Sequence, residues 1–202
     1  MTHCHVCRSV VLTVLLAATA ADAQVIDRVL AVVDGRLVTL SDVRASTALG
    51  LLQADEVSVA ADRWIERLLI LQEVDRFAPP EPPAAEIDAR IARVLASPAT
   101  LARLAELGVT QDWVRRWVRD DLRIESYIEQ RFAGSLEPGP EEMESYFRQH
   151  PGELERDGRR LGDAEAQALA RERLMTSRRR ALVADWLDGL ERRATISRPA
   201  AP

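Results

Sequence analysis

Apolar residues recur every three or four positions along most of the chain, and this spacing sets the fold class. Such spacing places the apolar side chains on one face of a helix. The proline-rich stretch 79–83 ends the segment with the widest apolar face, because proline cannot continue a helix. We therefore expect a mainly α-helical protein, in which the longest helices cover 58–77, 84–96, 111–132 and 163–192.

Strand-like segments rich in β-branched residues lie near the two ends of the chain. Residues 25–33 and 36–40 flank Asp34-Gly35, a pair that suits a two-residue hairpin turn because both positions need a positive φ. Residues 194–197 form a third strand candidate. We therefore expect a small β element at the two ends of the chain.

Polar residues before the helical segments mark their expected starts. We predict that Ser41, Ser58, Thr110 and Asp163 act as N-terminal caps, since short polar side chains accept hydrogen bonds from free backbone N–H groups there. Gly108 is expected to end a short helix, because glycine tolerates the left-handed conformation common at that position.

Residues 1–23 have the three-part layout of a secretory signal peptide. A weakly basic start precedes an apolar run at 10–18, and Ala21-Asp22-Ala23 supplies the small-x-small pattern expected before cleavage at Gln24. The run is about half of the ~20 residues that a membrane-spanning helix needs, so a retained anchor is the weaker alternative. We expect export to the periplasm, cleavage near Ala23 and no stable membrane insertion afterwards.

The cysteines and most of the histidines lie inside this leader. Cys4 and Cys7 stand beside His3 and His5, and the rest of the chain adds only His150. A structural zinc site normally needs four ligands held by a folded frame. We therefore expect no metal, no disulfide and no cofactor in the mature protein.

The remaining polar residues show no catalytic pattern. No phosphate loop, nucleophile elbow or metal-ligand spacing follows residue 23, and the net charge of −5 argues against a nucleic-acid partner. We interpret His150 as a helix C-cap and the glutamates as charges at a helix start. Two groups of arginines are interpreted as solvated helix faces. For the group at 178–180, attraction of phosphate or anionic lipid is the alternative. These glutamates and arginines are Glu141, Glu142 and Glu144, then Arg115, Arg116, Arg119 and Arg123, then Arg178, Arg179 and Arg180.

The order of these elements resembles the SurA-type periplasmic chaperones. The resemblance is carried by 26–43, by 64–73, by 141–151 and by 186–196. Members of this family often carry a parvulin isomerase domain after the position of His150-Pro151. In this chain only the polar stretch 152–162 separates that position from the last helix. The resemblance therefore implies a SurA-like N-terminal helical domain over 24–151, and a helix and strand over 163–202 that return to it. It also implies that the last strand meets the N-terminal hairpin and ties the two ends together.

The same resemblance implies a function. It indicates a holding chaperone that binds unfolded envelope proteins, including outer-membrane proteins, in an apolar cleft. Isomerase activity is the least supported reading, because the family's isomerase site uses paired histidines. The candidate cleft residues are Trp113, Trp117, Tyr127 and Phe132, with a role in the core as the alternative. A structural or interaction module for one specific envelope partner is the rival function, and a homodimer is left open.

Overall fold

The computed structural model describes residues 27–156 and 159–199. The predicted leader at 1–23 and its expected cleavage site lie outside these residues. The described part is mainly helical with a small antiparallel sheet, which confirms the expected fold class. In chain order the elements are β1 (Val29–Val33), β2 (Arg36–Thr39), α1 (Leu40–Ala48), α2 (Val57–Phe77), α3 (Ala84–Val94), α4 (Pro98–Glu106), α5 (Gln111–Phe132), η1 (Ala133–Ser135), α6 (Pro140–Gln149), η2 (Pro151–Leu154), β3 (Glu155–Arg156), β4 (Arg159–Arg160), α7 (Asp163–Glu191) and β5 (Ile196–Ser197).

The two ends of the described chain meet in one three-stranded sheet of order β2-β1-β5. Asp34 and Gly35 form the hairpin turn with φ values of 47° and 84°, as the sequence predicts. β5 pairs antiparallel with β1, with Ile196 opposite Val33. The Asp34 amide donates to the Thr195 carbonyl over 3.0 Å, and the Thr195 amide donates to the Asp34 carboxylate over 2.8 Å. The prediction that the last strand meets the hairpin is confirmed.

The helix caps agree with the sequence only in part. Thr110 caps α5 and accepts a hydrogen bond from the Trp113 amide, and Gly108 has a φ of 64° just beyond α4, as expected. The other three N-caps are wrong by one or two residues. Thr39 caps α1, Glu56 precedes α2 without a capping side-chain bond, and Gly162 precedes α7. Each of these helices starts one or two residues before the predicted cap, because other residues near the start have the extended backbone that an N-cap requires.

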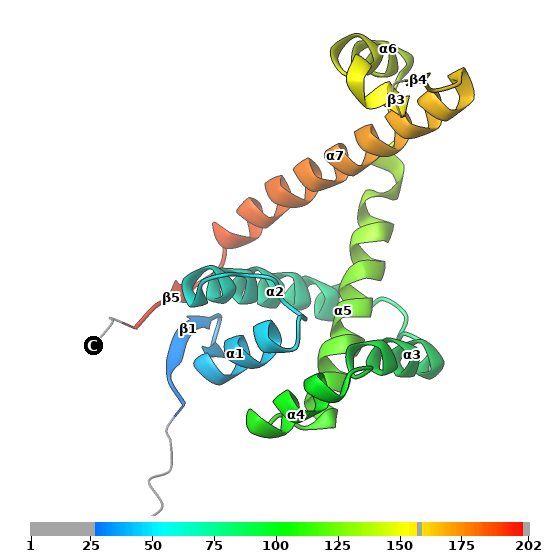
Figure 1. Ribbon diagram of the computed structural model, residues 1–202. Helices are drawn as coiled ribbons and strands as arrows, with labels where there is room; N and C mark the ends of the chain where they lie inside the picture. The colour runs from blue at the N-terminus through cyan, green and yellow to red at the C-terminus, as the bar shows by residue number, and fades with distance from the viewer. Residues whose placement is uncertain (1–26, 157–158, 200–202) are drawn as a thin grey trace, which may run out of the picture.

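The main body is built around α2. This helix packs against the sheet, α1, α5 and the C-terminal half of α7, as Figure 1 shows. Its buried residues Ile65, Leu69 and Val74 belong to two apolar clusters, one under the sheet and one between α2, α5 and α7. A third cluster fills the space between α3, α4 and α5. Among the described helices, none combines the length and apolar composition needed to cross a bilayer.

A small lobe at the far end of α7 was not expected. Figure 1 shows α6, β3 and β4 packed on the N-terminal half of α7, away from the sheet. The lobe has its own buried residues, which are Tyr146, Leu154, Ala166 and Ala170. Leu154 is buried in this lobe, so 152–162, a polar stretch by composition, contributes an apolar side chain to a core of its own. Only the C-terminal half of α7 therefore returns to the main body.

Candidate binding groove

Two of the predicted cleft residues, Trp113 and Trp117, lie between the helices of the main body. The Trp117 side chain is buried, its ring stacks on Trp113 at 5.5 Å and meets Trp64 edge-on at 4.8 Å. The Arg67 guanidinium lies 3.8 Å from the centre of the Trp117 ring. Trp113 is partly buried, and its indole N–H donates to Asp42 on α1. These contacts give both side chains a role in holding α1, α2 and α5 together.

The other two predicted residues belong to a separate aromatic group. Tyr127 and Phe132 are both buried, and their rings lie 5.8 and 5.9 Å from the ring of Trp186 on α7. The exposed Phe77 stacks on Tyr127 at 5.9 Å. The structure does not bring the four predicted residues into one cleft. Their burial supports the alternative role in the core, while peptide binding by them stays a prediction.

Residues weighed for acid–base chemistry have structural partners. His150 is the C-cap of α6, as expected, and its Nδ1 lies 3.3 Å from Glu153. Burial and the hydrogen bond to Glu153 raise the pKa of Tyr146 to about 12. Glu142 accepts from the Gly139 amide at the start of α6, and the hydrogen bond from Arg178 lowers the pKa of this carboxylate. Glu142 thus has the role at the helix start that the sequence indicates.

Arg178 also departs from the expected solvated face. It donates to the Glu137 carbonyl over 2.6 Å and pairs with Glu142, while Arg171 pairs with the Glu137 carboxylate. These bonds fix the α5–α6 connection to α7. No group of three or more potential metal-ligating side chains occurs in the described part of the chain.

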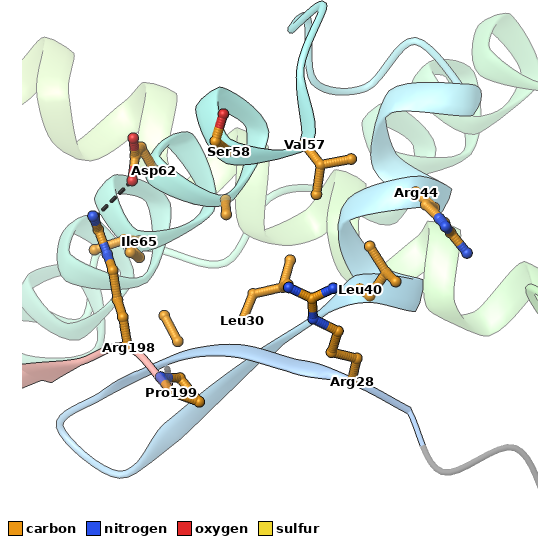
Figure 2. A pocket seen from close by; sticks show the side chains of 12 residues that line it. Arg28, Leu30, Leu40, Arg44, Val57, Ser58, Asp62, Ile65, Arg198 and Pro199 are labelled. Carbon is orange, nitrogen blue, oxygen red and sulfur yellow. Dashed lines mark hydrogen bonds and ion pairs between the residues drawn. The ribbon is translucent and has the colours of Figure 1, made fainter. Parts of the chain in front are cut away.

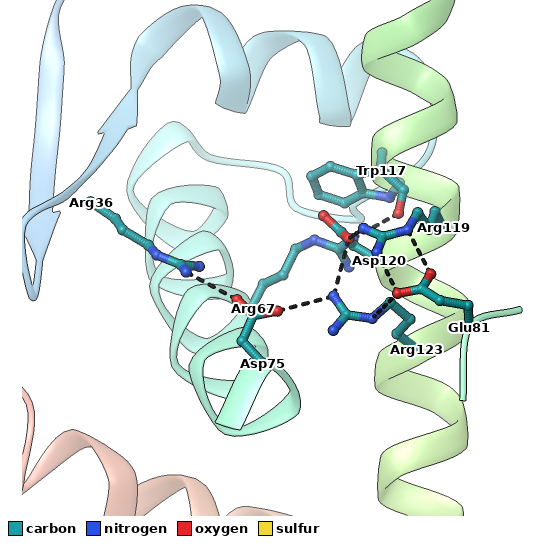
Figure 3. Close-up of polar contacts among 8 residues, drawn as sticks. All are labelled: Arg36, Arg67, Asp75, Glu81, Trp117, Arg119, Asp120 and Arg123. Atoms are coloured by element: carbon teal, nitrogen blue, oxygen red, sulfur yellow. Dashed lines mark hydrogen bonds and ion pairs between the residues drawn. The ribbon is translucent and has the colours of Figure 1, made fainter. Parts of the chain in front are cut away.

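The interpretation of the α5 arginines as a solvated face is wrong for Arg123. Its side chain is only 9% exposed and lies in an ion-pair cluster between α2, α5 and the proline-rich loop, shown in Figure 3. Arg123 donates to Asp75 over 3.0 Å, and Glu81 and Asp120 lie 3.7 Å away. Asp75 also accepts from Arg36 at the hairpin. The cluster therefore joins the sheet, α2, α5 and the loop.

Two opposing effects set the pKa values of the carboxylates in this cluster: burial raises them, and the nearby arginines lower them. Burial disfavours the charged form of Asp75, but hydrogen bonds from Arg36 and Arg123 outweigh it and lower its pKa. The hydrogen bond from Arg119 lowers the pKa of Glu81. For Asp120 burial outweighs the nearby arginines, and its pKa is raised. Because every charge faces a partner, this arrangement supports a structural role for the cluster.

An open apolar groove lies elsewhere, between the hairpin, α1 and the start of α2 (Figure 2). Its volume is about 490 Å³. Apolar side chains from three separate segments line it, and Val57 at its edge is 45% exposed. The apolar lining consists of Leu30, Ala31, Leu40, Val57, Ala61, Ile65 and Pro199.

The charged residues of the groove are arranged unevenly. Arg198 donates to Asp62 over 2.7 Å, and Figure 2 shows this pair at one end. Arg28 and Arg44 lie toward the other end, and neither guanidinium makes a hydrogen bond or ion pair with a residue that the structure describes. The groove thus combines an apolar surface with two uncompensated positive charges.

Sequence reasoning missed this groove because its walls come from 28–44, 57–65 and 198–199, which only the folded sheet brings together. One signal was present, since every residue of Val29–Val33 is apolar. A strand without a polar face has more apolar surface than a strand that is buried on one side only.

A comparison of the sequence with protein-family models found no match, and a comparison with curated proteins found none.

Proposed function

We propose that this protein is a periplasmic holding chaperone that binds extended apolar segments of unfolded polypeptides in the groove between the hairpin, α1 and α2. The observation that carries the proposal is an open apolar groove beside a sheet edge. Its volume lies within the ~300–1,000 Å³ typical of ligand pockets. The resemblance of 26–43 and 64–73 to SurA-type chaperones supports it, because both segments contribute to the groove.

The neighbouring sheet edge offers a sequence-tolerant way of binding. β5 pairs with only Val32 and Val33 of β1, so Val29–Ala31 has no described strand on that side. Pro199 lacks an N–H and cannot extend the pairing. An extended client segment that continues the sheet along this edge gains main-chain hydrogen bonds, which do not depend on its side chains. Its apolar side chains then enter the groove.

This mode of binding needs neither nucleotide nor metal, and we propose that the protein is not an enzyme. The proposed location rests on the leader predicted for 1–23, which would deliver the chain to the compartment where envelope proteins are unfolded.

The proposal is tested by aggregation of an unfolded outer-membrane protein that is diluted from urea into buffer with the mature chain. We expect the wild type to reduce light scattering at molar excess. Val57→Glu places a charge at the edge of the groove. This variant should need at least a threefold higher protein concentration for the same reduction in light scattering. Leu101→Glu is the matched control, because Leu101 is an equally exposed apolar residue on α4, outside the groove.

Three results would count against the proposal. Absence of suppression by the wild type would reject the chaperone function. Equal loss in both variants would show that general surface hydrophobicity, and not the groove, is responsible. Capture of one tight partner by the wild type, without suppression of aggregation, would favour the rival function as a structural module.

A further inference from the structure

We infer that the groove selects polypeptide segments that end in a free α-carboxylate directly after apolar residues. This inference rests on the proposed function and specifies its substrate class. The anion would lie at the end of the groove that holds Arg28 and Arg44, and the apolar residues before it would lie over Leu30 and Ile65.

The first argument is that neither guanidinium has an acidic partner among residues 27–156 and 159–199. The nearby acids are all engaged by other groups. Asp27 accepts from Ser41, Asp62 accepts from Arg198, and Glu56 accepts from the Ser58 hydroxyl. Figure 2 shows the guanidinium of Arg28 extending over the groove toward Leu30 and Leu40. A guanidinium placed beside apolar surface, without a carboxylate, is suited to bind a carboxylate of the ligand.

The second argument comes from the start of α2 at the same end. Val57 and Ser58 line the groove there, and Glu56 makes no side-chain capping bond. The first turn of a helix carries free N–H groups and a partial positive charge. This field adds to that of Arg28 and Arg44, whereas Arg198 at the opposite end is neutralised by Asp62. The groove therefore has a positive end and a neutral end.

The polarity of the groove distinguishes a terminal carboxylate from an acidic side chain. An α-carboxylate is attached to the last backbone carbon, so the charge follows the apolar residues without a spacer and the chain stops at the arginines. An internal Asp or Glu would require the chain to continue past both guanidiniums and the start of α2. We therefore assign the positive end to the C-terminus of the bound segment.

The test measures binding of short labelled peptides to the mature chain by fluorescence anisotropy. The probes are the hexapeptide Ser-Ala-Val-Leu-Val-Leu as a free acid, the same peptide as a C-terminal amide, and an amidated peptide with an internal Glu. We expect the free acid to bind about tenfold more tightly than the amide, as one charge-assisted hydrogen-bonded pair at a partly exposed site allows. The preference should decrease with added salt.

Variants assign the preference to the two arginines. In Arg28→Gln/Arg44→Gln the ratio of the two affinities should fall close to one, and each single variant should reduce it. Arg116→Gln is the matched control, because Arg116 is exposed on α5 and has no ion pair with a described residue. Arg28→Lys/Arg44→Lys keeps the charges and should retain most of the preference. Urea unfolding of each variant shows whether it is folded.

The possible outcomes separate this inference from the proposed function. Equal binding of acid and amide by the wild type overturns the inference while the chaperone proposal stands. A preference that persists in Arg28→Gln/Arg44→Gln, or one shared by the peptide with the internal Glu, also overturns it. Failure of every peptide to bind also overturns the inference, whereas the chaperone proposal is decided separately by the aggregation assay. Binding of myristate, with no binding of peptides, would show that the groove takes an anionic lipid instead.

Discussion

The ion-pair cluster around Arg123 predicts that removing the carboxylate of Asp75 lowers the stability of the fold more than removing the guanidinium of Arg123 does. The reason is the difference in burial, since the side chain of Arg123 is 9% exposed and that of Asp75 is 44% exposed. Asp75→Asn leaves a buried guanidinium without its nearest carboxylate. Arg123→Met leaves carboxylates that water can reach and fills the space with an apolar side chain.

The expected magnitudes follow from the remaining partners. Removing one member of a buried ion pair costs about 3–5 kcal/mol when nothing replaces it. Glu81 and Asp120 still lie 3.7 Å from Arg123, which reduces the cost. Asp120 compensates poorly, because burial already raises its pKa. We therefore expect Asp75→Asn to lower the free energy of unfolding by about 2 kcal/mol, and Arg123→Met by less than about 1 kcal/mol.

Urea unfolding followed by tryptophan fluorescence measures both changes, because urea does not screen charges and Trp117 lies on the same helix as Arg123. With a slope of about 2 kcal/mol per molar urea, Asp75→Asn should move the midpoint down by about 1 M. The double variant Asp75→Asn/Arg123→Met should be more stable than Asp75→Asn alone. The reasoning is refuted if Arg123→Met is the more damaging change, or if the two effects simply add.

Three further predictions concern pH, the hairpin and the lobe. Asp75 and Glu81 have lowered pKa values, so their stabilisation is complete above about pH 5, beyond their unfolded pKa values, and is lost as the pH falls through the folded pKa values. The urea midpoint should therefore drop as the pH falls below about 5, and it should drop less in Asp75→Asn. Asp34→Ala removes the acceptor of the Thr195 amide at a φ of 47° and should cost about 1–2 kcal/mol in the same assay, whereas Asp34→Asn, which tolerates this φ, should cost less. Leu154→Ala should increase hydrogen exchange across 140–175 without changing the tryptophan-monitored midpoint, since Leu154 is buried in the lobe and all four tryptophans lie in the main body.

The elements that the sequence predicts well are those determined by local chemistry. The hairpin depends on Asp34-Gly35, and the long helices depend on periodic apolar residues between prolines. The pairing of β5 with β1 was also predicted, although from the order of elements and not from local signals. The caps of α1, α2 and α7 were misplaced because several polar residues stand near each helix start and only the backbone conformation selects among them.

The burial of Arg123 shows why charge patterns mislead within an amphipathic helix. Arg123 was grouped with the arginines around it because they share a helix and alternate with acids. Its sequence neighbours Leu122 and Ile124 are both buried, so the position lies within the apolar face. A charged residue at such a position needs acidic partners from other elements, here Asp75 of α2. That requirement becomes visible only when the packing of α2 against α5 is known.

The placement of the groove explains how a chain of this kind could bind clients without an isomerase domain. All of its lining residues come from 28–65 and from 198–199, whereas 152–162, the stretch at which SurA-type chaperones often carry a parvulin domain, belongs to the lobe at the far end of α7. Changes in the lobe therefore leave the groove walls in place. The pairing of β5 with β1, in contrast, does affect the groove, because it positions Arg198 and Pro199 there. Loss of that pairing would remove the neutral end of the groove and weaken client binding while the helices of the main body stay folded.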